Sequence, residues 1–291
     1  MWKFVKHHEF YLGSLIFLFS ILWMVSFLGS YNWFVVLPLG ISWIGMICLF
    51  DFFERKYFRH TIIPDTHMRK RKLFLIIAIS LLFCVLLDGF GVFITQLWHY
   101  PFWSLKVYLS IAPFAYVAYS ILLYILYEFV RDLVMRHKKV TTGSNVSRKI
   151  YVLLMKSELV LGIAGYILNI LLITRMYSSL SFRFYILITF FVSTFCIFEY
   201  IGFRQNKQTL THDILSGNWW PIIFIFIANA VAVIVIEFAN TPFQVWTFAN
   251  WPFDHIRFLN LPIVALLLWP IQFPVFLSML RAVFPSREVV W

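Results

Sequence analysis

Two carboxylic acids stand within long apolar stretches of the chain, and each is followed at nearly the same distance by a glutamine and then a tryptophan. The matched residues are Asp88, Gln96 and Trp98 in the first half, and Glu237, Gln244 and Trp246 in the second. Apolar surroundings favour the neutral form of a carboxyl group, which is the form that a general acid requires. The pattern therefore predicts a pair of proton-transferring groups, with Asp88 and Glu237 as the catalytic candidates.

The residues that recur near these acids complete the candidate site. Indole rings can face a cationic intermediate, and a proline inside a helix frees a backbone carbonyl and kinks the helix. We assign contact with substrate to the recurring amides, indoles and prolines, which are Gln96, Trp98, Pro113, Gln244, Trp246 and Pro262. A structural alternative stays open, in which the two buried acids only form hydrogen bonds with Gln96, Gln244, Asn240 or Asn229.

Polar residues recur in order about 149 positions apart, as a tandem duplication would produce. Carboxylates, amides and prolines that repeat inside apolar runs are harder to obtain by chance than repeated Phe or Leu, of which this chain is rich. Further matched pairs are Glu9 with Glu158, Gly13 with Gly162, Cys48 with Cys196, Asp51 with Glu199, and Pro113 with Pro262. The duplication predicts that Asp88 and Glu237 face one shared cavity across a pseudo-twofold axis.

The composition places the chain in a lipid bilayer, because 62% of its residues are hydrophobic and 13% are charged, against about 25% charged in soluble domains. Eight apolar stretches have the length of about 20 residues that a membrane-spanning helix needs: 10–29, 33–53, 73–96, 106–130, 150–174, 183–203, 219–240 and 259–281. We predict an all-α polytopic membrane protein of eight helices in two parallel four-helix repeats. The repeats are residues 1–136 and 150–291, joined by a cytoplasmic linker at 137–149.

The distribution of Lys and Arg predicts the orientation of these helices. Basic residues collect in short cytoplasmic segments, and here they cluster at 55–72 and 131–149. Both termini are therefore expected to be cytoplasmic. The net charge of +11 then reflects membrane topology and contact with anionic lipids, and we expect no nucleic-acid partner. A protein partner remains possible.

Motifs for nucleotide, metal or cofactor binding are absent from the sequence. It contains no P-loop, GxGxxG, HExxH, GxSxG or paired CxxC motif, each of which carries a defined chemistry. Two loops rich in aromatic residues lie at 98–103 and 246–253, and His99, Asp254 and His255 lie in or beside them without a spacing typical of a metal site. We therefore expect neither a metal nor an organic cofactor.

Several short motifs resemble the lycopene cyclase family of small membrane proteins, which occur as heterodimers or tandem fusions. They are the runs Leu87-Asp88-Gly89-Phe90-Gly91, Leu109-Ser110-Ile111-Ala112-Pro113, Asp51-Phe52-Phe53-Glu54-Arg55, and His255-Ile256-Arg257-Phe258-Leu259-Asn260-Leu261-Pro262-Ile263. The resemblance implies a helical membrane fold, a carotenoid or isoprenoid ligand, and cyclisation initiated by an acid. The family's Pro-x-Glu-Glu sequence is replaced here by Pro113-Phe114-Ala115-Tyr116 and Pro262-Ile263-Val264-Ala265. Fold and ligand class therefore carry over better than catalysis.

These expectations combine into one leading hypothesis and two alternatives. The leading hypothesis is an integral membrane protein that binds an isoprenoid, carotenoid or similar lipid between its repeats, with possible acid-initiated cyclisation, hydration or isomerisation. The alternatives are a non-catalytic membrane scaffold or assembly subunit, which the missing glutamate pairs favour, and a lipid transporter.

Overall fold

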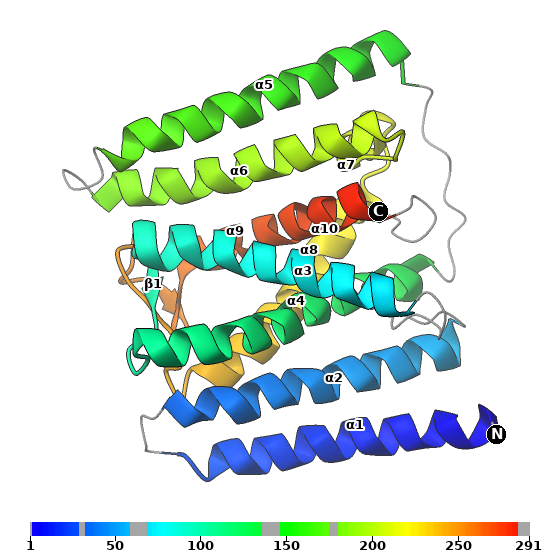
Figure 1. Cartoon of the computed structure of the whole chain (residues 1–291), viewed down its shortest axis with the longest axis vertical. Coiled ribbons are helices and arrows are strands. Elements are labelled where there is room, and N and C mark those ends of the chain that lie inside the picture. The colour runs from blue at the N-terminus through cyan, green and yellow to red at the C-terminus, as the bar shows by residue number, and fades with distance from the viewer. Residues whose placement is uncertain (1, 29–32, 59–68, 136–145, 175–179, 285–291) are drawn as a thin grey trace. The chain divides into compact units, whose positions relative to one another are not determined.

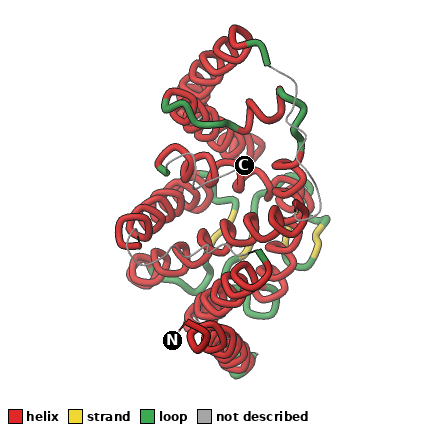
Figure 2. Tube along the Cα trace, turned by 90° about the vertical axis from the view of Figure 1, so that its right-hand side faces the viewer, coloured by secondary structure: helices red, strands yellow, loops and turns green. Residues whose placement is uncertain are grey.

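The computed structural model describes the whole chain except residues 1, 29–32, 59–68, 136–145, 175–179 and 285–291. Helices make up most of the described chain, and strands are confined to two-residue segments (Figure 2). The long helices are α1 (Trp2–Val25), α2 (Val36–Tyr57), α3 (Arg69–Asp88), α4 (Leu105–Met135), α5 (Arg148–Ile173), α6 (Leu180–Arg204), α8 (Trp220–Asn240) and α10 (Gln272–Val283). The shorter elements are η1 (Trp33–Val35), η2 (Gly89–Ile94), α7 (Leu210–Leu215), α9 (Ile263–Leu268) and η4 (Trp269–Ile271), with strands β1 (Trp98–His99), β2 (Thr247–Phe248), β3 (Arg257–Phe258) and β4 (Leu261–Pro262).

Within the described residues, seven helices are long and apolar enough to cross a membrane, so the protein is an all-α, multi-pass membrane protein. The expected first span appears as a shorter apolar helix, Phe10–Val25. Helix α5 shows the apolar exterior most clearly, since Leu153, Val160 and Ile170 are each more than 60% exposed. Such side chains fit a hydrocarbon environment, where apolar exposure carries no penalty. The orientation of the termini and the complete repeat architecture remain predictions.

The chain folds into two compact units, and each contains a segment from the other half of the sequence. Unit 1 comprises Met1–Cys84, Tyr100–Lys138 and Ala230–Thr247. Unit 2 comprises Val85–His99, Lys139–Asn229 and Phe248–Trp291. The predicted linker at 137–149 lies for the most part outside the described residues.

The first two helices of each half of the chain pack closely against each other. In unit 1, α1 lies along α2, and in unit 2, α5 lies along α6 (Figure 1). A Cβ atom on Gly13 would lie 3.0 Å from Cβ of Cys48, and one on Gly162 would lie 3.4 Å from Cβ of Cys196. Small residues allow membrane helices to approach closely. The recurring Gly and Cys therefore form corresponding helix contacts in the two halves.

The last predicted span begins later than expected and is interrupted. A small antiparallel ladder pairs Arg257 with Pro262 and Phe258 with Leu261, so α9 starts only at Ile263. The 3-10 segment η4, which contains Pro270, then separates α9 from α10. A proline removes a backbone donor from a helix, which accounts for the interruption.

Candidate functional site

Asp88 is the last residue of α3 and is held by the indole of Trp98 in unit 2. The Asp88 side chain is 0% exposed, and Trp98 Nε1 donates to Asp88 Oδ1 at 3.0 Å. The π-helix η2 separates the two residues, with Thr95 N donating to Phe90 O at 2.8 Å. Wider turns of this kind often occur at functional sites. Here the chain reverses direction after the π-helix, and this reversal brings the Trp98 indole back to Asp88.

Two backbone features make this return possible. Gln96 adopts a positive φ of 54°, a left-handed conformation that is uncommon for a residue with a side chain. Gly91 leaves room for the indole, because a Cβ atom there would lie 1.8 Å from Cη2 of Trp98. Glycine at position 91 is thus required by close approach of the ring.

Glu237 in unit 1 is held by the same kind of donor. Trp246 Nε1 donates to Glu237 Oε1 at 3.0 Å, and Asn240 Nδ2 donates to Glu237 Oε2 at 3.3 Å. Asn240 also binds the backbone of Trp246 through both its amide atoms, and Gln244 has a φ of 49°. The Glu237 side chain is 0% exposed. We call each of these acid and tryptophan pairs a carboxyl–indole motif.

The two motifs correspond closely in their local geometry. In each, the glutamine two positions before the tryptophan has a positive φ, and the indole N–H reaches the acid over 3.0 Å. Asp88 belongs to unit 2 and Glu237 to unit 1. The prediction that the two acids face a common cavity remains a prediction.

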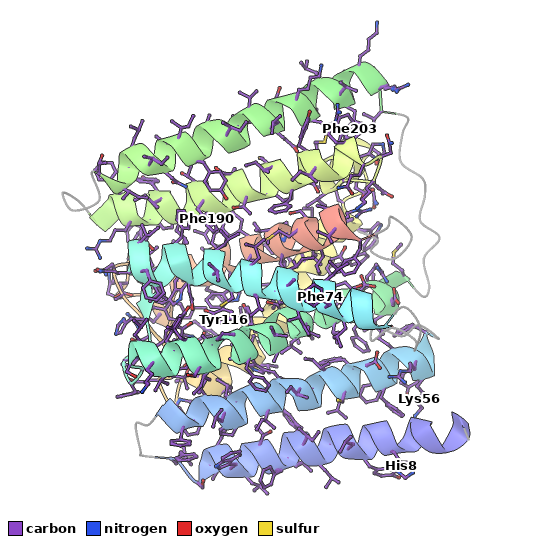
Figure 3. All side chains as sticks on the ribbon, viewed as in Figure 1. His8, Lys56, Phe74, Tyr116, Phe190 and Phe203 are labelled. Carbon is purple, nitrogen blue, oxygen red and sulfur yellow. The ribbon has the colours of Figure 1, made fainter. Side chains whose placement is uncertain are left out.

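The turn after η2 is fixed by side chains from distant parts of unit 2. Arg183 Nη1 donates to Gln96 Oε1 at 2.9 Å, and Asn250 Nδ2 donates to Gln96 O at 2.9 Å. Trp251 Nε1 donates to Leu97 O at 2.7 Å. In η2, which precedes this turn, the ring of Phe90 stacks on Phe190 of α6, with ring centroids 4.0 Å apart. Phe190 is labelled in Figure 3.

The remaining predicted site residues take different positions. Pro113 lies inside α4 on an exposed part of the helix, whereas Pro262 is buried in β4 and directly precedes α9. The recurrence of these two prolines in the sequence therefore does not correspond to one local structure. Of the amides weighed in the structural alternative, Asn240 does bind Glu237.

The sequence did not identify Arg183, Asn250 or Trp251 as site residues. Nothing in the spacing of these residues marks them, because they meet the Gln96 turn from parts of the chain about 87 and 154 positions away. The only feature that could have drawn attention to Asn250 and Trp251 is the density of Trp and Asn in the loop at 246–253.

Acids at the basic ends of the helices have charged or hydroxyl partners. Asp51 pairs with Arg55, and Glu128 pairs with Arg131 at 2.7 Å. Glu158 and Glu199 instead share Thr211, whose hydroxyl donates to Glu158 at 2.5 Å and whose backbone N donates to Glu199 at 3.0 Å. Such pairing is typical of structural acids.

The carboxyl–indole motifs differ chemically from those pairs. Indole and amide N–H groups are neutral donors, so they orient the carboxyl group without neutralising it. A buried carboxyl group held in this way can exchange a proton with a hydrophobic ligand or can serve as a rigid hydrogen-bonded crosslink.

Comparison with known protein families, with curated proteins and with solved structures finds no match to this chain.

Proposed function

We propose that the protein binds an isoprenoid or similar hydrophobic lipid in the membrane, with the carboxyl–indole motifs as its polar contacts. The observation that carries the proposal is the occurrence of the same arrangement twice, with Asp88 and Glu237 both fully buried and both bound by an indole N–H at 3.0 Å. Ligand sites are commonly apolar and contain a few precisely placed polar groups.

The proposal extends to acid-initiated chemistry on a polyene. A buried carboxyl group would transfer its proton to a terminal double bond, the resulting cation would close a ring or shift a bond, and loss of a proton would restore the acid. Cation–π attraction allows a nearby indole to stabilise such a cation. The resemblance of the Asp88 segment to lycopene cyclases supports this reaction class.

A lipid extraction experiment tests ligand binding first. Native mass spectrometry of the full chain, purified in mild detergent, should detect a retained isoprenoid or pigment. The Asp88→Asn and Glu237→Gln variants should retain less of it or convert added polyprenoids more slowly. Asp254→Asn is the matched control, since that acid is 37% exposed and pairs with Arg257. Equal ligand retention and equal turnover in all four proteins would refute the assignment.

A non-catalytic scaffold is the second candidate function. Both oxygens of Glu237 accept hydrogen bonds from side chains of its own unit, as a structural crosslink requires. Co-purification of a protein partner in fixed ratio, without bound lipid, would favour the scaffold over the lipid-binding protein.

A further inference from the structure

Arg183 is a guanidinium without a carboxylate partner in the described residues of unit 2. Its hydrogen bond goes to a neutral amide oxygen, that of Gln96. Two other acids of unit 2 have partners of their own: Asp254 pairs with Arg257 at 2.6 Å, and Asp88 accepts the Trp98 indole. A cation that is partly withdrawn from water normally requires a negative partner.

The remaining donors of Arg183 are poorly satisfied. A guanidinium has five N–H donors, and the buried Nε atom finds no acceptor among the described residues. The residue as a whole is partly exposed, so a ligand can reach it. Arginine matches the geometry of phosphate oxygens, to which it can donate two parallel hydrogen bonds.

Helical spacing places Arg183 at the end of the interface between α6 and η2. Arg183, Leu187 and Phe190 follow at intervals that share one face of a helix, and Phe190 stacks on Phe90 of η2. The same face therefore leads from an aromatic, apolar contact to an uncompensated positive charge. Leu187 and Phe190 are themselves buried, so the hydrocarbon chain of an amphiphile would lie along the exposed apolar side chains of α6, Tyr185 and Val192, with its anionic head at Arg183.

We propose that Arg183 binds the phosphate head of an amphiphile at the Gln96 turn. This inference rests on the proposed lipid-binding function and adds the chemical class of the ligand's polar end. Because the Gln96 turn also carries Trp98, an anion bound there would adjoin the segment that holds Asp88. The phosphate belongs either to a prenyl diphosphate ligand or to a bilayer phospholipid.

Two probes that differ only in the anion test this proposal. The full chain is placed in phosphatidylcholine nanodiscs, and tryptophan fluorescence is titrated with geranylgeranyl diphosphate or with geranylgeraniol. The wild type should bind the diphosphate at least about tenfold more tightly than the alcohol, as one well-placed charge-assisted contact would provide. Arg183→Gln should remove most of that preference and leave the affinity for the alcohol unchanged.

Control variants separate recognition of the anion from loss of structure. Arg183→Gln retains an N–H donor for Gln96, and Arg183→Lys retains the charge and should keep part of the preference. Arg148→Gln removes the same charge from an exposed position at the start of α5 and should change nothing. An unchanged preference in Arg183→Gln would overturn the assignment, as would an equal loss for both probes.

The outcomes also distinguish the source of the phosphate. If the diphosphate has no advantage but native mass spectrometry finds a phosphatidylglycerol retained only when Arg183 is present, the phosphate site stands and its ligand is a bilayer lipid. If the wild type binds the alcohol and the diphosphate equally and retains no such lipid, the phosphate site fails while the proposed lipid-binding function survives. Binding of neither probe, with no retained lipid, refutes both.

Discussion

The indole nitrogen of Trp98 lies 3.0 Å from the carboxylate of Asp88, the same distance that separates the indole of Trp246 from Glu237. Both acids are fully buried. A buried acceptor that loses its donor bears its full desolvation penalty. The hydrogen bond from each indole therefore contributes to the stability of the fold, independently of any ligand.

Trp98→Phe should destabilise the protein by about 1–3 kcal/mol, because it removes a hydrogen-bond donor from a buried carboxyl group. Thermal unfolding in detergent measures the effect. Trp219→Phe is the control, since Trp219 is 56% exposed and should tolerate the change. Pairing Trp98→Phe with Asp88→Leu should give a smaller loss than the two single changes added together. Strict additivity would argue against the hydrogen bond.

Gly91→Ala should disrupt the Asp88 motif, whereas Gly89→Ala should not. A Cβ at position 91 would lie 1.8 Å from the Trp98 ring, but a Cβ at position 89 would have nothing within 4 Å. Overpacking of this kind typically costs about 1–3 kcal/mol. Both glycines lie in η2, so helix propensity cancels in the comparison. Near-ultraviolet circular dichroism and thermal unfolding should change for Gly91→Ala alone, and matching behaviour of the two variants would contradict the close approach.

Gly45→Ala should weaken the pairing of α1 with α2, because its Cβ would lie 2.8 Å from the backbone N of Phe17. Backbone cannot yield as a flexible side chain can, so we expect a loss of about 1–3 kcal/mol. Gly40→Ala on the same helix meets its nearest atom at 3.5 Å and should be neutral. Proteolysis of the isolated protein, together with its melting temperature, reports the difference.

Glu54→Gln should stabilise unit 1 by about 1–2 kcal/mol, because it replaces a buried acceptor that lacks donors. Glu54 is 0% exposed, and no donor in the described residues reaches its carboxylate oxygens. The nearby Arg131 already binds Glu128 and Asp132. An amide at position 54 can donate to the neighbouring Asp132.

Glu128→Gln provides the contrast for Glu54→Gln. It weakens the pair between Glu128 and Arg131, which keeps Asp132 as a partner, so we expect a loss of about 1.5–3 kcal/mol, as for a hydrogen bond to a charged group. The two glutamine variants should thus shift the melting temperature in opposite directions. A decrease in both would show that Glu54 has a stabilising partner.

Asp213→Asn should reduce the pH dependence of stability. Asp213 lies outside the spanning helices, and its burial raises the pKa of the carboxyl group above the ordinary value of 3.8, although Asn218 and Gln208 bind it and oppose the rise. The folded state then binds more protons than the unfolded state as the pH rises from 3.8, so the free energy of unfolding falls until the raised pKa is passed. Melting temperatures measured across that window should fall less in the variant, and identical slopes would contradict the raised pKa.

The sequence predicted the long helices well because their apolar stretches match the thickness of a bilayer. It also singled out Asp88, Trp98, Glu237 and Trp246, since polar residues repeat against an apolar background. It assigned acid and indole to separate roles, however, because their hydrogen bond depends on the backbone reversal at Gln96 and Gln244. Backbone conformation at a single residue leaves little trace in residue type.

Other features escaped prediction because they are short or depend on distant contacts. Helix α7 has only six residues and lies between the predicted spans 183–203 and 219–240. Its Thr209 cap binds His212 N at 3.1 Å, a contact that stabilises a helix too short to persist alone. The hydrogen bonds that hold the Gln96 turn join residues far apart in the sequence, so they could not be predicted from it.

Each unit includes one segment from the other half of the sequence: Val85–His99 is part of unit 2, and Ala230–Thr247 is part of unit 1. A gene cut at the midpoint would therefore give two products that each lack a piece of their own bundle and carry a loose piece of the other. Such fragments should be unstable when expressed separately and should recover only when synthesised together.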